Sequence, residues 1–298
     1  MSWKGDLLKA GISSDGIDVD IFQGKLTARN VYVPVGNVYY VDKRVTSSGN
    51  GRSWSQAYKT IAEAVTVMNG RIDWSESPWA KGDICFIGPG VYAENLISLP
   101  YGCMLVGAGH DMRDGQFGTK IKPAAGAPVD VGACINSAFV NIGFESPGTV
   151  AAFDADIMNN NLFQDCYFTG PAETATIAAC IVTKDAVMNK LIRGQFSCAD
   201  KGIDVNYADG GDSFSHNLIK ECVFDQIDTA GIEISTNLVG PSSKVIDCCF
   251  FGAGQTMSIA IDDNSAILDV AKCFAESTSG FSGCRSVNGS YNNGTLIT

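Results

Sequence analysis

Two acidic residues, Asp204 and Glu233, occupy matching positions in repeated segments, Ile203-Asp204-Val205 and Ile232-Glu233-Ile234. If these segments are neighbouring β-strands, the two carboxyl groups start about 5 Å apart on one outward face. Carboxyl groups about 5–5.5 Å apart suit retaining glycoside hydrolysis. Each would also shift the pKa of the other, as acid–base catalysis requires. Outward acids are also ordinary on a solvated strand face when the net charge is −11. We therefore favour a structural role for the pair and keep catalysis as the alternative.

Other acidic residues suggest further sites. Asp154 is a candidate for the same column as Asp204, with Val182 in the coil between them. Asp209 and Asp212 could hold calcium through hard oxygen ligands, although Asp also forms turns without a metal. We favour the turn and expect neither a metal nor a cofactor.

The chain has 11 cysteines without a Cys-x-x-Cys pair, and its two histidines are His110 and His216. A zinc site made of Cys and His ligands therefore has little to draw on. We interpret the cysteines as free thiols that act as small apolar core residues, and His216 as a turn or lining residue.

The elements that position these residues follow from a repeat. Six segments align on phenylalanines spaced 24–28 residues apart: Phe144, Phe168, Phe196, Phe224, Phe250 and Phe274. An apolar residue lies five positions earlier in five of them: Phe139, Phe163, Leu191, Ile219 and Val245. A small polar residue lies seven positions earlier: Ser137, Asn161, Asn189, Asn217 and Ser243. Three aligned columns at one period indicate a repeat architecture.

A second extended segment in each repeat shows period-2 alternation, as in Ile203-Asp204-Val205, Ile232-Glu233-Ile234 and Ile259-Ala260-Ile261. Repeats of strands and turns can stack as coils of a solenoid whose strands pair in parallel. We expect phenylalanines and cysteines inside, and the Asn/Ser column along a turn, with amides bonded to the backbone or to one another. A propeller blade of about 40 residues fits less well.

Residues 53–68 carry the clearest helical pattern. Ser53 and Gln56 form a capping-box pattern, and one face collects Ala57, Ile61, Ala64, Val65 and Met68. We predict that this helix covers the open end of the solenoid, in preference to binding a partner.

The run Tyr39-Tyr40-Val41-Asp42, Gly49-Asn50-Gly51, Trp54, Ala57, Thr60-Ile61 and Ala64-Val65 resembles the N-terminal cap of pectate-lyase-like proteins. The segments Gly82-Asp83-Ile84, Gly88-Pro89-Gly90-Val91-Tyr92 and Val106-Gly107-Ala108-Gly109 are similar to that family's first coils. The resemblance covers about residues 38–298. It implies an all-β, right-handed, single-stranded parallel β-helix with a cap at 38–80 and coils over 81–298. It does not specify function, because this fold hosts lyases, hydrolases, adhesins and inert virion parts.

Residues 1–37 lie outside the resemblance and are expected to form an extended arm with a strand within 24–33. Such an arm ahead of a β-helix is similar to those of bacteriophage structural proteins, where it attaches the solenoid to a particle. The alternative is a loose tail or an additional capping strand.

The family's enzymes supply specific comparisons. Polygalacturonase-like members use Asn-x-Asp, Asp-Asp and Gly-His-Gly, whereas here Asp262-Asp263 has no histidine motif beside it and Gly109-His110-Asp111 lacks the second glycine. Pectate-lyase-like members use a calcium-binding acidic cluster opposite a basic residue. Arg193 and Lys201 lie in one coil, but no acidic trio is expected to face them. Neither mechanism is supported.

The net charge of −11 disfavours nucleic acid and anionic membranes as partners. No segment reaches the roughly 18 apolar residues of a membrane span, and the N-terminus lacks a signal-peptide pattern. We expect assembly in a host cytoplasm, which agrees with free thiols.

The first hypothesis is a non-enzymatic bacteriophage virion protein. It would be a homotrimer attached through residues 1–37 to other virion proteins, with capsid decoration favoured over a tail position. The alternative is a tailspike-type polysaccharide depolymerase, a glycoside hydrolase or lyase that cleaves host surface glycan with Asp204 and Glu233. A third hypothesis is glycan binding without cleavage through Tyr167 and Tyr207.

Overall fold

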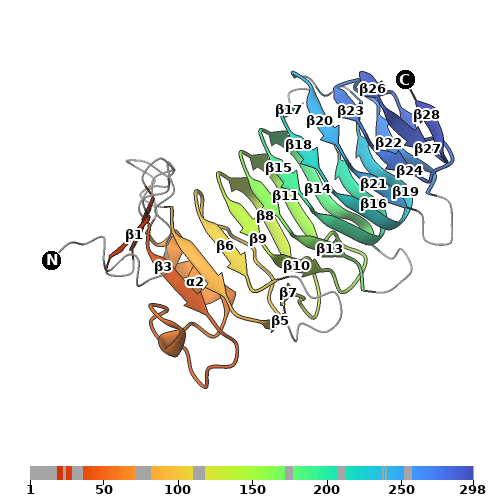
Figure 1. The fold of residues 1–298 in the computed structure, drawn as a ribbon. Coiled ribbons are helices and arrows are strands. Elements are labelled where there is room, and N and C mark those ends of the chain that lie inside the picture. Colours follow the sequence, from red (N-terminus) through yellow and green to blue (C-terminus); the bar gives the residue numbers. More distant parts are fainter. Residues whose placement is uncertain are drawn as a thin grey trace.

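The protein is an elongated, right-handed parallel β-helix, as predicted (Figure 1). The computed structural model describes the strands at 19–22 and 25–28 and residues 36–71, 82–109, 118–171, 177–206, 213–236, 238, 240–251 and 257–297. One short α-helix lies at the N-terminal end of the stack and the strands β26 to β28 lie at the other (Figure 1). Among the described residues, the pairings within the stack are parallel except for that of the last two strands, β27 and β28.

The first face of the solenoid is a ten-stranded sheet. Its strands, in order along the axis, are β3 (Val38–Val41), β4 (Ile84–Ile87), β6 (Met104–Gly107), β9 (Ala138–Val140), β12 (Leu162–Gln164), β15 (Lys190–Ile192), β18 (Leu218–Lys220), β20 (Ser243–Ile246), β23 (Leu268–Ala271) and β26 (Ser286–Asn288). In most of these strands the inward residues are buried and the outward residues are partly exposed, which is the alternation that a half-buried strand requires.

The other two faces belong to one 16-stranded sheet. The second face contains β5 (Gly90–Tyr92), β7 (Thr119–Ile121), β10 (Ile142–Glu145), β13 (Tyr167–Thr169), β21 (Cys249–Phe251), β24 (Phe274–Ala275), β27 (Ser290–Asn292) and β28 (Thr295–Ile297). The third face contains β8 (Val129–Ile135), β11 (Phe153–Asn159), β14 (Ile177–Val187), β17 (Phe214–Ser215), β22 (Ile259–Asp263) and β25 (Phe281–Ser282). Two long strands, β16 (Gln195–Val205) and β19 (Val223–Ile234), contribute to both faces.

Stacked phenylalanines fill the interior behind the second face. Phe168, Phe196, Phe224 and Phe250 follow one another in register, with ring centroids 5.2, 4.6 and 4.6 Å apart. Such offset stacks add to the free energy gained by burying the rings. The predicted inner column is confirmed through these residues.

The prediction that Phe274 belongs to the inner column is wrong. Phe274 pairs with the outward Cys249, and Ala275 takes the inner position beside Phe250. The sequence alignment of this repeat is shifted by one residue, because the counterpart of Cys222-Val223-Phe224 is Cys273-Phe274-Ala275. With this register, Val270 pairs with Val245 and supplies the apolar position that the sixth repeat had lacked.

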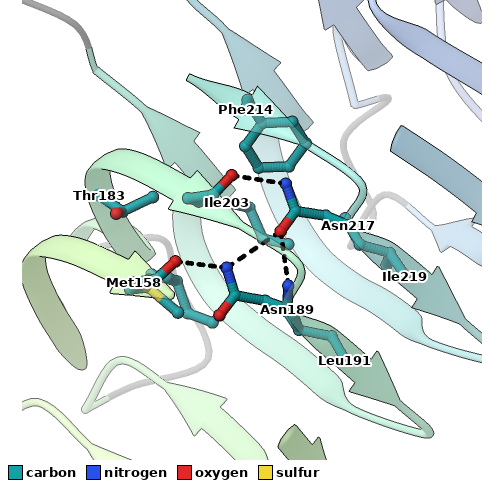
Figure 2. A pocket seen from close by; sticks show the side chains of 10 residues that line it. Met158, Thr183, Asn189, Leu191, Ile203, Phe214, Asn217 and Ile219 are labelled. Carbon is teal, nitrogen blue, oxygen red and sulfur yellow. Dashed lines mark hydrogen bonds between the residues drawn. The ribbon is translucent and has the colours of Figure 1, made fainter. Parts of the chain in front are cut away.

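The polar column forms a buried hydrogen-bonded ladder at the turn into the first face. The Asn189 amide donates to the carbonyl of Met158 (2.6 Å) and to Asn217 Oδ1 (3.0 Å), and Asn161 donates to Asn189 in the same way. Figure 2 shows the contacts of Asn189 with Met158 and Asn217. They lie beside a small apolar void of about 20 Å³. The predicted role of the column is therefore confirmed.

The residue before four of the five ladder positions adopts the left-handed conformation. It is Asn136, Asn160, Met188 and His216 in successive coils, with φ between 53° and 59°. Asn tolerates this conformation better than Met does. His216 is an exposed turn residue, which agrees with its sequence interpretation.

The helix predicted for residues 53–68 divides into two elements. A 3₁₀ turn covers Trp54–Gln56, Ser53 makes no capping bond, and the α-helix α2 spans Ile61–Asn69. The capping box is Thr60 with Glu63, because Ala57 leaves the helical conformation and a new start is needed. The predicted apolar face nevertheless covers the first coil, since Ile61, Ala64, Val65 and Met68 join the core.

At the N-terminal end, β1 (Val19–Phe22) and β2 (Lys25–Ala28) form an antiparallel hairpin, and β2 lies within the strand expected at 24–33. The remaining residues before Gly36 lie outside the described part of the chain. No helix among the described residues is long and apolar enough to cross a membrane.

Candidate functional site

The acidic residues Asp154, Asp204 and Glu233 of the third face lie in one column, as the sequence predicted. Asp204 of β16 pairs in register with Glu233 of β19, and Asp154 pairs with Val182, which pairs with Asp204. Parallel strands lie about 4.8 Å apart, so side chains in one column are close neighbours.

The column is longer than predicted. Asp130 precedes Asp154, and Asp262 follows Glu233. The predicted alignment of Ile259 with Ile232 is wrong by two residues, because Ile232 pairs with Ile261. This shift places Asp262 beside Glu233, a neighbour that sequence reasoning had not assigned.

A lysine bridges the two candidate carboxylates. Lys201 Nζ lies 3.2 Å from Asp204 Oδ2 and 2.9 Å from Glu233 Oε1. The register between β16 and β19 shifts just before the lysine, because β19 has one additional residue between Ile227 and Ala230, opposite Ala199 and Lys201. Its side chain is 20% exposed, and those of Asp204 and Glu233 are 13% and 27% exposed, so all three charges are shielded from bulk water.

These contacts shift the pKa values of the charged groups. Burial raises the pKa of Asp204, the ammonium of Lys201 partly offsets this, and the charge of Glu233 adds to the rise. For Lys201, burial alone would lower the pKa, but the hydrogen bond to Glu233 and the charge of Asp204 outweigh it and raise the pKa. Lys201 therefore stays protonated and cannot serve as a catalytic base near neutral pH.

The other predicted lyase base has a different partner. Arg193 forms a forked pair with Asp165, Nε to Oδ1 at 2.6 Å and Nη2 to Oδ2 at 2.7 Å. Both residues lie at the left-handed turn between the first two faces. Arg193 and Lys201 thus belong to separate ion-pair clusters.

Asp263, half of the Asp-Asp motif, holds a turn. Its carboxylate accepts backbone N–H bonds from Ser265, Ile267 and Leu268. Burial raises its pKa, although those hydrogen bonds act in the opposite direction. Its neighbour Asp262 points outward into the acidic column, so the two carboxylates do not act as a pair.

Tyr167, proposed as a surface aromatic, is buried. Its hydroxyl lies 2.7 Å from Ser197 Oγ, and 7% of the residue is exposed. Tyr207, Asp209, Asp212 and His110 lie outside the described residues. Within the described part of the chain, no three His, Cys, Asp or Glu residues are grouped to hold a metal ion.

The cysteines are free and lie mainly in the core, as predicted. Cys166, Cys222, Cys248 and Cys273 recur beside the phenylalanine column. Burial raises the pKa of Cys166 to about 12, so its thiol is not a nucleophile.

Sequence reasoning missed a second ion cluster, on the second face. Lys120 Nζ lies 2.8 Å from Glu145 Oε2, with side chains 4% and 10% exposed, and Lys122 also pairs with Glu145. These residues sit at outward strand positions, where the alternation predicts solvent. The sequence carries no signal that the side chains of Lys120 and Glu145 are buried.

Comparison with known proteins gives a similarity of fold. No family model matches the chain, and no curated protein matches its sequence. Among solved structures, it is similar to a pectin methylesterase in complex with a hexasaccharide, with 11% identity and a TM-score of 0.49 over 87% of this chain and 90% of that one. It is also similar to the Dettilon tailspike protein, with 10% identity and a TM-score of 0.40 over 80% of this chain and 50% of that one. The chain thus spans about half of that tailspike, and the fold assignment itself rests on the strand pairing.

Proposed function

We propose that this chain is a non-enzymatic structural module of a bacteriophage virion, attached to the capsid through residues 1–37 and assembled as a homotrimer. The observation that carries the non-enzymatic part is the bridge from Lys201 to both Asp204 and Glu233. The virion assignment draws on the arm that precedes a β-helix in the sequence.

The bridge matters because retaining hydrolysis assigns the two carboxyl groups different tasks. One must be protonated to act as an acid, and the other must be a free carboxylate that can attack the sugar. The ammonium of Lys201 engages one oxygen of each carboxylate, and it opposes the rise that burial causes in the pKa of Asp204. Asp204 and Glu233 then serve as partners of Lys201 and stabilise the stack.

The architecture suits a particle component. Parallel ladders run through the coils of the first face from β3 to β26, and an apolar core runs beside them, with stacked rings from Phe144 to Phe250. Backbone hydrogen bonds between coils leave few unpaired groups inside the stack. Such a module resists unfolding outside the cell without disulfide bonds.

The competing function is glycan cleavage, and the observation in its favour is the raised pKa of Asp204, which a general acid needs. To test it, the intact protein is incubated with host capsular polysaccharide and lipopolysaccharide, and new reducing ends and unsaturated uronates are measured. We expect neither. Cleavage that disappears in both Asp204→Asn and Glu233→Gln would overturn the structural assignment.

Attachment and assembly are tested separately. Phage particles grown with a chain lacking residues 1–37 should not incorporate the protein, and light scattering of the full-length protein should give the mass of three chains. Incorporation of the truncated chain would contradict the anchor, and a monomeric mass would contradict the trimer.

A further inference from the structure

A surface hollow of about 260 Å³ lies on the outer side of the first face, near the N-terminal cap. Its lining includes Arg44, Trp54, Phe86, Gly88, Val106 and Ala108. The hollow shares no residue with the acidic column of the third face.

Its aromatic wall is held in place by packing. Tyr40 pairs in register with Phe86, their rings stack at 5.9 Å, and Trp54 packs edge-on against Tyr40 at 4.9 Å. Trp54 nevertheless remains 48% exposed and the 3₁₀ turn that carries it buries none of its residues. A large aromatic surface is thus presented in a fixed orientation, so a ligand would lose little side-chain entropy by stacking on it.

The rim of the hollow carries an oriented guanidinium. Arg44 donates from Nε to Asp42 Oδ1 at 2.9 Å and from Nη2 to Asp42 Oδ2 at 2.8 Å. Asp42 is itself buried, and its Oδ1 also accepts the Arg44 backbone N–H, so the fork has a defined plane. A guanidinium has five N–H donors, and this fork engages two of them. The remaining donors can reach a ligand carboxylate.

The charge around the hollow differs in sign from the rest of the chain. Residues 38–71 contain five basic residues and two acidic ones, a net charge of +3, in a chain whose net charge is −11. The basic residues are Lys43, Arg44, Arg52, Lys59 and Arg71, and the acidic ones are Asp42 and Glu63. Asp83 and Glu94 also contact this segment, through Arg71 and the first turn of α2, and reduce its net charge from +3 to +1. The cap is still less negative than the chain as a whole, which favours an anion there.

We propose that the hollow binds an acidic saccharide, with the C–H face of a pyranose ring on Trp54 and its carboxylate on Arg44. The electron-rich ring face attracts the weakly positive C–H groups of a sugar, and the Arg–carboxylate contact supplies charge and orientation. A neutral sugar lacks the second contact. A polynucleotide is disfavoured because its many phosphates would meet the strongly negative remainder of the chain.

The test uses the full-length protein and three acidic probes: oligogalacturonate, oligomannuronate and a hyaluronan oligosaccharide. Each is titrated by calorimetry at low salt, alongside a neutral galactose oligosaccharide of matched length. We expect saturable binding of at least one acidic probe, at least tenfold tighter than the neutral probe. Absence of saturable binding by all three acidic probes would overturn the proposal.

Three variants assign the binding to the hollow. Trp54→Ala and Arg44→Gln should each weaken the best acidic probe at least tenfold, and Trp54→Phe, which keeps an aromatic face and guards against unfolding of the cap, should retain most of the affinity. Lys59→Gln is the matched control, because it removes one positive charge from the same cap without lining the hollow. A loss in Lys59→Gln equal to that in Arg44→Gln would show a diffuse field effect and refute the site. Unchanged affinity in Trp54→Ala would refute it as well.

Discussion

Replacing Lys201 by methionine tests whether the acidic column is structural. The substitution keeps much of the aliphatic stem but removes the ammonium that lies 3.2 Å from Asp204 and 2.9 Å from Glu233. Breaking a fully buried pair costs about 3–5 kcal/mol, whereas an exposed pair contributes about 0–1 kcal/mol. The three side chains are 13–27% exposed, so we expect Lys201→Met to lower the free energy of unfolding by about 2–3 kcal/mol at neutral pH.

The loss should depend on pH. Because the folded-state pKa of Asp204 is already raised, protonation of this group favours the folded state. Its favourable contribution is therefore complete below the ordinary aspartate pKa and is lost as the pH rises through the folded-state value. Removing Lys201 raises that pKa further, so the difference between variant and parent should shrink as the pH falls from about 7 towards about 4.

The assay is urea unfolding followed by circular dichroism, at several pH values and at low and high salt. Lys184→Met is the matched control on the same face, since Lys184 pairs with Asp156 at 2.7 Å but both side chains are about half exposed. We expect that control to cost less than about 1 kcal/mol. Equal and small losses in both variants would refute the argument and leave the two carboxylates free for chemistry.

Three further predictions concern the core and turns, each measured as the change in urea unfolding free energy. Asn189→Ala should cost about 2–4 kcal/mol, because the Met158 carbonyl and the Asn161 backbone N–H lose a buried partner; a loss below about 1 kcal/mol would mean that the ladder is dispensable. Met188→Gly should stabilise by about 1 kcal/mol, because Met188 is exposed with φ 59°, and destabilisation would contradict that backbone assignment. Phe250→Ala should cost about 3–5 kcal/mol and Phe274→Ala much less, since Phe250 is buried and Phe274 faces outward; equal losses would refute the register.

The inward columns could be predicted from sequence because burial restricts them to apolar or fully hydrogen-bonded residues. Phe196, Phe224 and Asn189 recur at nearly constant spacing, since each must meet an equivalent residue in the next coil. The same restriction explains why the errors fall near the C-terminal end. There, Phe274 lies one residue before the inward position of its coil, and Ile259 lies two residues before the residue that pairs with Ile232. The pairings of Ala275 with Phe250 and of Ile261 with Ile232 define the register.

The outward chemistry was predictable only in part. The stacking of Asp204 on Glu233 follows from spacing, but Lys201 contacts both carboxylates at a point where the register between β16 and β19 shifts by one residue, and the sequence carries no mark of that shift. The hollow at Trp54 likewise requires the folded cap loop, because Trp54 and Phe86 belong to separate elements. Trp54 itself was visible as part of the cap pattern, without any indication that it would be exposed.

A parallel solenoid stacks equivalent residues about 4.8 Å apart, so an acidic position repeated in successive coils concentrates like charges. The third face reduces this repulsion around Asp204 in two ways. Val182 separates Asp154 from Asp204 by a second strand spacing, to about 10 Å, where salt screens exposed charges strongly. Asp204 and Glu233 are direct neighbours, and there Lys201 supplies the counter-charge. The position of the lysine is thus explained by the electrostatics of the fold, without a substrate.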